Sequence, residues 1–339
     1  MVRAGMGRVR NADGFLRSSG WGDARRTPLA GDASARRYER LALGDKTAIL
    51  MDAPPEQADD IADFVKIDRH LHSIGLSAPK LLAENMAQGF LLLEDFGDGV
   101  FARLAKAEPT REPQLYEAAT DVLLHLQSQP PAPGLPNLTA LEWARAADLA
   151  VEWYRFAITG NRSGGAELVG ALHEALAKWA DGPRVMVLRD YHAENLMFLS
   201  DRTGVKSVGL LDFQLAQLGQ PGYDMVSLLQ DARRDVTPEV EHQMIRRFLA
   251  GCGMDEVAFR SAYAALGAQR ALRILGIFAR LCLRDSKAGY VALMPRVWSQ
   301  LQRNLAHPAL TRLAKVSADL IPEPTPHLNW IEGQCGNFR

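Results

Sequence analysis

Two acidic residues and an amide have the types and spacing that phosphoryl transfer requires. Asp190 is followed five residues later by Asn195, and seventeen residues further on by Asp212, which ends an apolar run. In such a reaction one carboxylate orients the attacking hydroxyl and accepts its proton, while oxygen ligands hold Mg²⁺ against the phosphates. Mg²⁺ prefers hard oxygen donors, commonly one or two carboxylates. We therefore predict Asp190 as the catalytic base and Asn195 and Asp212 as metal ligands.

The elements around these residues favour this interpretation. Short strands are predicted at 184–188, 196–199 and 207–212, so that Asp190 and Asn195 lie in a loop between strands and Asp212 ends the last one. An isolated D-x-x-x-x-N is common by chance, and an Asp after a strand is often an ordinary turn residue. The order strand, loop, strand, strand, Asp is what points to chemistry.

The N-terminal part is predicted to be β-rich and to hold a nucleotide. Residues 38–43 and 47–51 flank Gly44-Asp45, which is a hairpin signature, and a helix is expected over 59–73. A buried strand is expected at 90–93, entering a loop. Phosphates would be covered by a flexible turn, and adenine would meet backbone groups after the buried strand. The residues expected there are Gly31, Asp32 and Ser34 in the turn, and Glu94, Asp95 and Phe96 at the hinge.

Protein kinases hold phosphate with a lysine on their third strand, and the corresponding strand expected here at 47–51 carries no lysine at its end. That strand ends in Met51-Asp52, and Lys46 lies at its start. Arg36 or Arg37 is predicted to compensate, because a guanidinium can hold phosphate through two hydrogen bonds.

The rest of the chain is predicted to be mainly helical. The fold class expected is α+β and two-lobed, with a small β-rich N-lobe at 1–95 and a larger helical C-lobe at 96–339 that carries the catalytic loop. Residues 1–20 look irregular. Helices are expected at 115–127, 140–158, 166–179, 223–230, 239–250, 255–283 and 297–305.

Composition excludes several classes of protein. Lys and Arg number 39 and Asp and Glu 40, so the formal charge of -1 gives no electrostatic case for nucleic acid. The three cysteines form no C-x-x-C pair, which fits a reducing compartment. The N-terminus has arginines but no apolar signal segment. We expect a cytoplasmic enzyme with a small-molecule substrate and no membrane or protein partner.

The segment Leu188 to Asn195 resembles the catalytic loop of the aminoglycoside phosphotransferase family, which shares the protein-kinase fold. The family loop reads H-G-D-x-H-x-x-N, and this chain keeps Asp190, His192 and Asn195 but has Leu188-Arg189 in place of His-Gly. The resemblance implies ATP and Mg²⁺ as cofactors. It also implies that His192 supports the loop and that Asp224, which begins the following helix, caps the loop backbone.

Within that family the chain is similar to bacterial sugar-1-kinases that phosphorylate the anomeric hydroxyl of N-acetylmuramate or N-acetylglucosamine in cell-wall recycling. In that subgroup Met-Asp at the end of the third strand is usual. The matching stretches are GDASARRY at 31–38, MDAPP at 51–55, GFLLLEDFG at 89–97, LRDYHAENLM at 188–197 and residues 211–231.

The carboxylate of N-acetylmuramate would suit an arginine clamp. Arg233 and Arg234 are candidates, and so is a stripe on one face of the predicted 255–283 helix, whose alternative role is a solvated surface. The stripe consists of Arg270, Arg273, Arg280 and Arg284. Two other functions stay open: a kinase for an aminoglycoside or choline-like substrate, which would need an acidic pocket, and a non-catalytic nucleotide-binding module, which would need the Asp-Asn-Asp trio to be broken.

Overall fold

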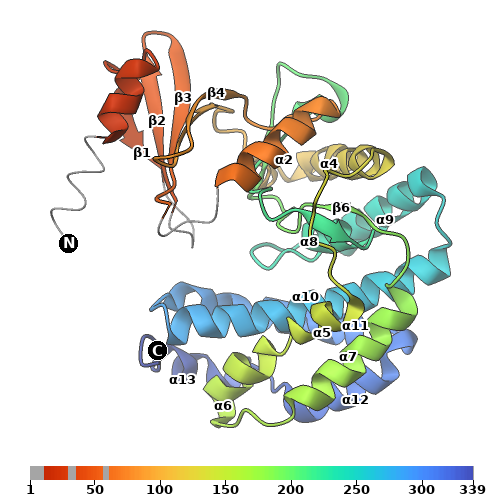
Figure 1. Ribbon diagram of the computed structural model, residues 1–339. Coiled ribbons are helices and arrows are strands. Elements are labelled where there is room, and N and C mark those ends of the chain that lie inside the picture. Colours follow the sequence, from red (N-terminus) through yellow and green to blue (C-terminus); the bar gives the residue numbers. More distant parts are fainter. Residues whose placement is uncertain (1–10, 30–35, 56–60, 339) are drawn as a thin grey trace. The chain divides into compact units, whose positions relative to one another are not determined.

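The computed structural model describes residues 11–29, 36–55 and 61–338 (Figure 1). The chain forms two compact units: unit 1 contains Met1–Arg111 and Glu194–Leu215, and unit 2 contains Glu112–Ala193 and Ala216–Arg339. The chain thus leaves and re-enters each unit, whereas the predicted lobes at 1–95 and 96–339 are continuous. The predicted catalytic loop runs from unit 2 into unit 1 between Ala193 and Glu194.

Unit 1 is built on an antiparallel sheet of five strands in the order β1-β2-β3-β5-β4. The predicted hairpin is confirmed: β2 and β3 pair with Leu43 opposite Lys46, and Gly44 takes the positive φ of 58° that the tight turn needs. β5, buried along most of its length, pairs with β3 and β4. The strands are β1 (Arg25–Pro28), β2 (Arg37–Leu43), β3 (Lys46–Asp52), β4 (Leu81–Asn85) and β5 (Phe90–Glu94).

The expectation that residues 1–20 are irregular is wrong, because residues 11–18 form a helix. Its apolar side chains Ala12, Phe15 and Leu16 are buried in one cluster with β-sheet residues. Phe15 stacks on Phe90 of β5 with ring centroids 5.8 Å apart. Phe15 and Leu16 follow Ala12 by three and four residues, about one turn, so the three side chains form the face that this short helix needs to bury.

A two-stranded ribbon in unit 1 positions both predicted metal ligands. β7 (Leu196–Phe198) and β8 (Val208–Leu210) are antiparallel, with Leu196 opposite Leu210. Asn195 directly precedes β7 and Asp212 follows β8 by two residues, so both lie at the same end of the ribbon. Helices α2 (Ile61–Ser73) and α3 (Phe101–Ala107) and the 3-10 turns η1 (Pro109–Arg111) and η3 (Gly204–Ser207) complete the unit.

Unit 2 is mainly helical, with one short ribbon of β6 (Val185–Val187) and β9 (Gln217–Gly219). The predicted helices at 115–127, 166–179, 223–230, 239–250, 255–283 and 297–305 are all confirmed with small shifts in their ends. The helices are α4 (Glu112–Ser128), α7 (Gly165–Trp179), α8 (Tyr223–Leu229), α9 (Pro238–Cys252), α10 (Glu256–Leu283), α11 (Met294–Leu305), α12 (Thr311–Leu320) and α13 (Leu328–Glu332), with 3-10 turns η4 (Ala288–Leu293), η5 (Pro308–Leu310) and η6 (Thr325–His327).

The single helix predicted at 140–158 is wrong, because this stretch is broken. It forms α5 (Ala140–Arg145), a π-helical segment η2 (Ala150–Arg155) and α6 (Phe156–Thr159). The break lies where α10 passes very close: a Cβ atom added to Gly276 would lie 2.3 Å from the carbonyl carbon of Leu149. The helical periodicity of the sequence gave no sign of this backbone contact.

The 28-residue α10 is the longest helix among the described residues and packs against α11, η2, α7 and α8. Figure 1 shows it running through the helical unit. Most of its side chains are buried, although arginines occur along it. In the part of the chain that the structure describes, no helix combines the length and apolarity needed to cross a bilayer.

The close contact at Gly276 yields a stability prediction. Gly276→Ala should lower the free energy of unfolding by about 2 to 3 kcal/mol, because the new methyl group meets backbone rather than a flexible side chain. Gly170→Ala in α7 is the matched control: nothing lies within 4 Å of its added Cβ, so alanine should stabilise by about 0.5 to 1 kcal/mol. Urea denaturation of both variants measures the difference, and equal effects would contradict the proposed contact.

Candidate active site

In unit 2 the loop that carries Asp190 is held by one buried carboxylate. Asp224, in the first turn of α8, is fully buried. Its Oδ2 accepts a hydrogen bond from the backbone N–H of Leu188 at 2.7 Å, and its Oδ1 accepts one from Arg189 N–H at 2.9 Å. Ser227, one turn later, donates its hydroxyl to the Arg189 carbonyl at 3.1 Å. Helix α8 thus fixes the backbone directly before the predicted base, in the capping geometry that the resemblance implied for Asp224.

The residue before the base is held in an unusual conformation. Arg189 has φ of 73°, a left-handed value that costs a non-glycine residue about 1 to 2 kcal/mol. The family loop has glycine here, which adopts this conformation without that cost. The hydrogen bonds from the Arg189 N–H to Asp224 and from the Ser227 hydroxyl to the Arg189 carbonyl offset the strain. The Asp190 N–H also donates to the Leu188 carbonyl at 2.9 Å. An arginine side chain is therefore tolerated at a position where the backbone favours glycine.

Burial raises the pKa of the Asp224 carboxyl to about 6, because the charged form is desolvated. The two backbone hydrogen bonds and the charge of Arg270 lower it in part, and the negative charge of Asp190 raises it. The group is still mainly ionised at neutral pH, so it can accept from both amides there. The Asp224 carboxyl therefore titrates close to neutral pH.

The residues after Asp190 turn inward and anchor the loop. Tyr191 is buried and its hydroxyl donates to the Ala119 carbonyl of α4 at 2.8 Å. His192 is buried, and its Nε2 lies 3.5 Å from Nη1 of Arg233. These contacts suit the supporting role predicted for His192, which remains a prediction.

The two arginines predicted to bind substrate differ in their surroundings. Arg234 forms an ion pair with Glu112 at 2.6 Å and donates a hydrogen bond to the Tyr116 hydroxyl. Arg233 lies beside His192, and its backbone N–H donates to Asp231 at 2.8 Å. The charge of Arg234 is thus already compensated within the protein, which makes Arg234 the weaker candidate of the two.

In unit 1 the two predicted metal ligands lie together at the end of the β7–β8 ribbon. The Asn195 carbonyl accepts from the Leu211 N–H at 3.0 Å, which ties the end of the catalytic loop to the strand before Asp212. Asp212 has a positive φ of 57°, and its Oδ1 accepts from Gln214 at 2.6 Å. The next residue, Phe213, is buried against Phe64 of α2 with ring centroids 4.9 Å apart.

This pair of oxygen donors fits Mg²⁺ in composition. Among the described residues, no group of three or more His, Cys, Asp or Glu side chains could enclose a metal ion. Mg²⁺ in phosphoryl-transfer sites needs no such cage, since it takes one or two protein ligands and completes its shell with phosphate and water. Asp212 and Asn195 would hold the ion in this way.

The surroundings of the missing lysine favour Arg36 as its substitute. Met51 is fully buried in β3, and Lys46 is exposed at the start of that strand. Arg36 is buried and hydrogen-bonds the Tyr38 hydroxyl. Burial raises the pKa of Tyr38, Arg36 lowers it and the charge of Asp212 raises it, which places Arg36, Tyr38 and Asp212 in one neighbourhood. Arg37 is exposed.

The predicted nucleotide contacts are described only in part. Gly31, Asp32 and Ser34 lie outside the described residues. At the hinge, the Glu94 carboxylate pairs with Arg202, and that of Asp95 pairs with Arg40 at 2.9 Å. The Phe96 ring lies 2.7 Å from where a Cβ on Gly209 would be. These side chains serve the fold, which is consistent with the prediction that adenine meets backbone groups.

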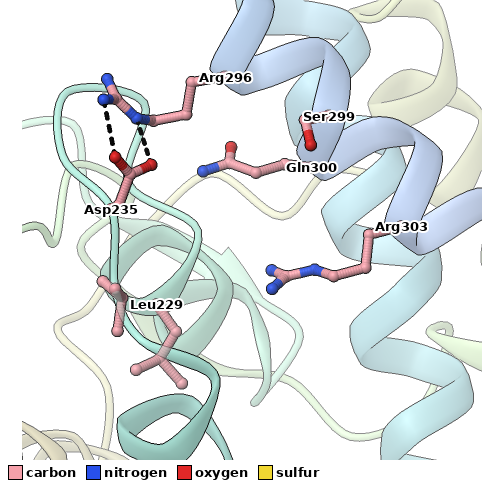
Figure 2. Close-up of a pocket in the computed structure, with 7 residues that line it drawn as sticks. Leu229, Asp235, Arg296, Ser299, Gln300 and Arg303 are labelled. Carbon is pink, nitrogen blue, oxygen red and sulfur yellow. Dashed lines mark hydrogen bonds and ion pairs between the residues drawn. The ribbon is translucent and has the colours of Figure 1, made fainter.

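A separate polar cavity of about 330 Å³ lies in unit 2 between α11 and the loop after α8 (Figure 2). Arg296, Gln300 and Arg303 project from α11 toward that loop, and the Arg296 guanidinium holds Asp235 through bonds of 2.6 and 3.0 Å. Arg303 pairs with Glu241 at 2.7 Å. Both arginines are thus compensated. No signal in the sequence marked this cavity, whose lining comes from distant segments.

Comparison with known proteins agrees with the fold and the loop. Residues 25–266 match the phosphotransferase enzyme family, so the chain belongs to that family. Over 337 aligned residues it is 41% identical to the N-acetylmuramate/N-acetylglucosamine kinase of Caulobacter vibrioides, covering 88% of this chain and 93% of that protein. A kinase of the same name from Pseudomonas aeruginosa is 34% identical, covering 89% of this chain and 91% of the relative.

Solved structures confirm the predicted two-lobed kinase fold. A choline/ethanolamine kinase family protein from Mesorhizobium loti has a TM-score of 0.62 at 16% identity, covering 92% of this chain and 99% of that one. A putative aminoglycoside phosphotransferase from Ralstonia eutropha has the same TM-score and identity, with 92% and 98% covered. The predicted family and its class of reaction, phosphoryl transfer, are therefore confirmed.

The buried carboxylate of Asp224 yields a prediction about how the free energy of unfolding depends on pH. Because its folded pKa of about 6 exceeds the ordinary 3.8, its contribution to stability is fully present below about pH 3.8 and is lost as pH rises through 6. Relative to Asp224→Asn, the wild type should lose about 3 kcal/mol between pH 4 and pH 7. The variant should also turn over more slowly, since the asparagine NH2 group replaces one of the two accepting oxygens and cannot accept a hydrogen bond from a backbone N–H.

Asp235→Asn is the matched control for this experiment. Hydrogen bonding from Arg296 lowers the pKa of Asp235, so its contribution is present above the ordinary pKa and is lost as pH falls. Denaturant unfolding from pH 4 to pH 7 should show a clear pH dependence of the difference between wild type and Asp224→Asn, and almost none for Asp235→Asn, whose effect falls below about pH 4. The same slope in both would contradict the assignment to Asp224.

Arg36 yields a second prediction. Arg36→Ala should raise KM for ATP or lower kcat by about tenfold or more, since a charge-assisted contact to phosphate is lost. Arg37→Ala and Lys46→Ala, at exposed positions, should change either parameter less than about twofold, and Arg36→Lys should recover part of the loss. Steady-state kinetics against ATP tests this, and a large loss in Lys46→Ala would contradict it.

Proposed function

We propose that the protein is a cytoplasmic sugar kinase that transfers the γ-phosphate of ATP to the anomeric hydroxyl of N-acetylmuramate and N-acetylglucosamine, and so serves cell-wall recycling. The observation that carries this proposal is the 41% identity, over 88% of the chain, to a kinase named for these two sugars. Asp190 lies on a loop whose backbone Asp224 fixes. Together with Asn195 and Asp212 it supplies groups suited to phosphoryl transfer.

The proposed mechanism assigns each group one task. Asp190 orients the sugar hydroxyl and accepts its proton as the oxygen attacks phosphorus. Asp224 and Ser227 hold the backbone from which Asp190 projects, so the carboxylate needs little reorganisation. Asn195 and Asp212 would hold Mg²⁺, which would neutralise charge on the phosphate oxygens. Arg36 contacts phosphate in place of the missing lysine.

An anomeric acceptor suits a carboxylate base. The hydroxyl at C1 is more acidic than an ordinary alcohol because the ring oxygen stabilises its anion. A base of modest strength such as Asp190 can then accept the proton without further activation. The product would be a sugar 1-phosphate without a free reducing end.

A cationic acceptor such as choline or an aminoglycoside fits the surroundings of Asp190 less well. Arg189 directly precedes the base, and the charges of Arg189, Arg270 and Asp190 all act on Arg273. A positively charged substrate would meet these guanidinium groups at short range and be repelled.

The role of Asp190 gives a direct prediction. Asp190→Asn should keep the fold and ATP binding but lower kcat about 10²- to 10⁴-fold, because the amide cannot accept the proton. Thermal unfolding and nucleotide titration serve as controls for fold and binding. Turnover within about threefold of the wild type would refute the assignment of the base.

The product itself tests the proposed function. The purified protein is incubated with ATP, Mg²⁺ and each of N-acetylglucosamine, N-acetylmuramate, glucose, choline and an aminoglycoside. The two amino sugars should react best, the product should lose its reducing end, and ³¹P–¹H coupling should join phosphorus to the anomeric proton. A product that still reduces copper, or whose phosphorus couples to the C6 protons, would refute phosphorylation at C1.

A further inference from the structure

Helix α10 brings arginine side chains to the loop that carries Asp190, all within unit 2. Arg270 is buried, and its guanidinium carbon lies 6.0 Å from the centre of the Tyr223 ring. Tyr223 begins α8 and precedes Asp224, which holds the loop amides. Arg273 lies three residues after Arg270 and therefore on the same face of α10. The face that meets α8 thus carries two positive charges.

Arg273 lacks the carboxylate partner that several other arginines of unit 2 have among the described residues. In the described part of the chain it forms neither an ion pair nor a hydrogen bond, although it is half-buried. On the same helix Arg260 pairs with Glu256 at 2.7 Å, and after it Arg284 pairs with Asp285 at 2.7 Å. The predicted arginine stripe is therefore divided, since Arg284 belongs to the exposed, compensated surface.

Burial and neighbouring charged groups shift the pKa of Arg273 in opposite directions. Burial lowers the pKa of Arg273, Tyr223 and Asp190 raise it, and Arg189 and Arg270 lower it. The Nε of Arg189 is also buried with no hydrogen-bond partner. Within the described residues, neither of these two guanidinium groups pairs with a carboxylate. Partial desolvation of an unpaired charge is unfavourable, and a bound anion would relieve it.

We propose that Arg273, assisted by Arg189, binds the lactyl carboxylate of N-acetylmuramate and so determines selectivity between the two amino sugars. The proposal rests on the proposed function. A substrate carboxylate brought near Asp190 is repelled by the carboxylate of the base, and these guanidinium groups offset that repulsion. Guanidinium holds a carboxylate through two parallel hydrogen bonds. N-acetylglucosamine has no carboxylate and would leave Arg273 unpaired.

The transferring phosphate is a second source of the same anionic chemistry. If Arg273 contacted phosphate in the transition state, its loss would slow both sugars equally, because phosphate is common to both reactions. If it contacts the lactyl carboxylate, its loss slows N-acetylmuramate far more. The ratio of kcat/KM for the two sugars therefore distinguishes the sources.

The test compares Arg273→Gln with the wild type and with Arg260→Gln, a control on the same helix. For Arg273→Gln, the ratio of kcat/KM for N-acetylmuramate to that for N-acetylglucosamine should fall about 10- to 100-fold, the range typical of a lost charge-assisted hydrogen bond. Arg260→Gln should leave the ratio unchanged within about twofold. Arg273→Lys should recover part of it.

A second measurement begins with the wild type alone. The wild type is given N-acetylmuramate and its neutral carboxamide, which should differ in kcat/KM by a similar factor, and Arg273→Gln should treat the two alike. Equal rates for acid and amide in the wild type, or equal losses for both sugars in Arg273→Gln, would overturn the role of Arg273 while leaving the sugar kinase intact. A wild type that phosphorylates neither sugar would overturn both proposals.

Discussion

The catalytic loop depends on the hydrogen bonds that one buried carboxylate accepts from two backbone amides. Asp224 is fully buried and accepts from Leu188 and Arg189, so the backbone leading into Asp190 is tied to the first turn of α8. Burying this charge is costly, as its raised pKa indicates, and the hydrogen bonds return only part of that cost. The buried carboxylate thus lowers the free energy of unfolding, while its hydrogen bonds fix the backbone of the loop before Asp190.

The same hydrogen bonds explain why the loop tolerates two adjacent departures from the family pattern. The histidine expected at position 188 is a leucine, whose side chain is buried and whose N–H binds Asp224. The glycine expected at 189 is an arginine with φ of 73°. A left-handed arginine persists only where its surroundings determine its backbone, and here Asp224 and Ser227 do so from one helix. Arg189, despite its strained backbone, places a guanidinium group next to the base in sequence, where glycine would have no side chain.

Much of this was predictable from the sequence, because the signals were local. The hairpin at Gly44-Asp45, the ribbon strands around Asn195 and Asp212, and the long helices follow from turn residues and periodicity, and the catalytic trio follows from residue type and spacing. The break in the helix predicted at 140–158 was not predictable, since nothing local in the sequence marks the close backbone approach of Leu149 and the distant Gly276. The helix at 11–18 was missed because its apolar face is short and acquires meaning only against Phe90. The choice of Arg36 over Arg37 likewise required knowledge of which side chain is buried.

Charge compensation separates arginines that maintain the fold from those free to act on a ligand. Arg234, Arg247, Arg296 and Arg303 each face a carboxylate on another element, namely Glu112, Asp121, Asp235 and Glu241, and so join helices and loops of unit 2. From the sequence these arginines look the same as Arg273, since residue type says nothing about partners. Arg273, one of the arginines predicted to meet the substrate carboxylate, is half-buried and forms no ion pair with the described residues, and the charge of Asp190 acts on it. An enzyme that must bring an anionic sugar to an anionic base needs positive charge at that place, and an arginine already neutralised by the protein cannot supply it.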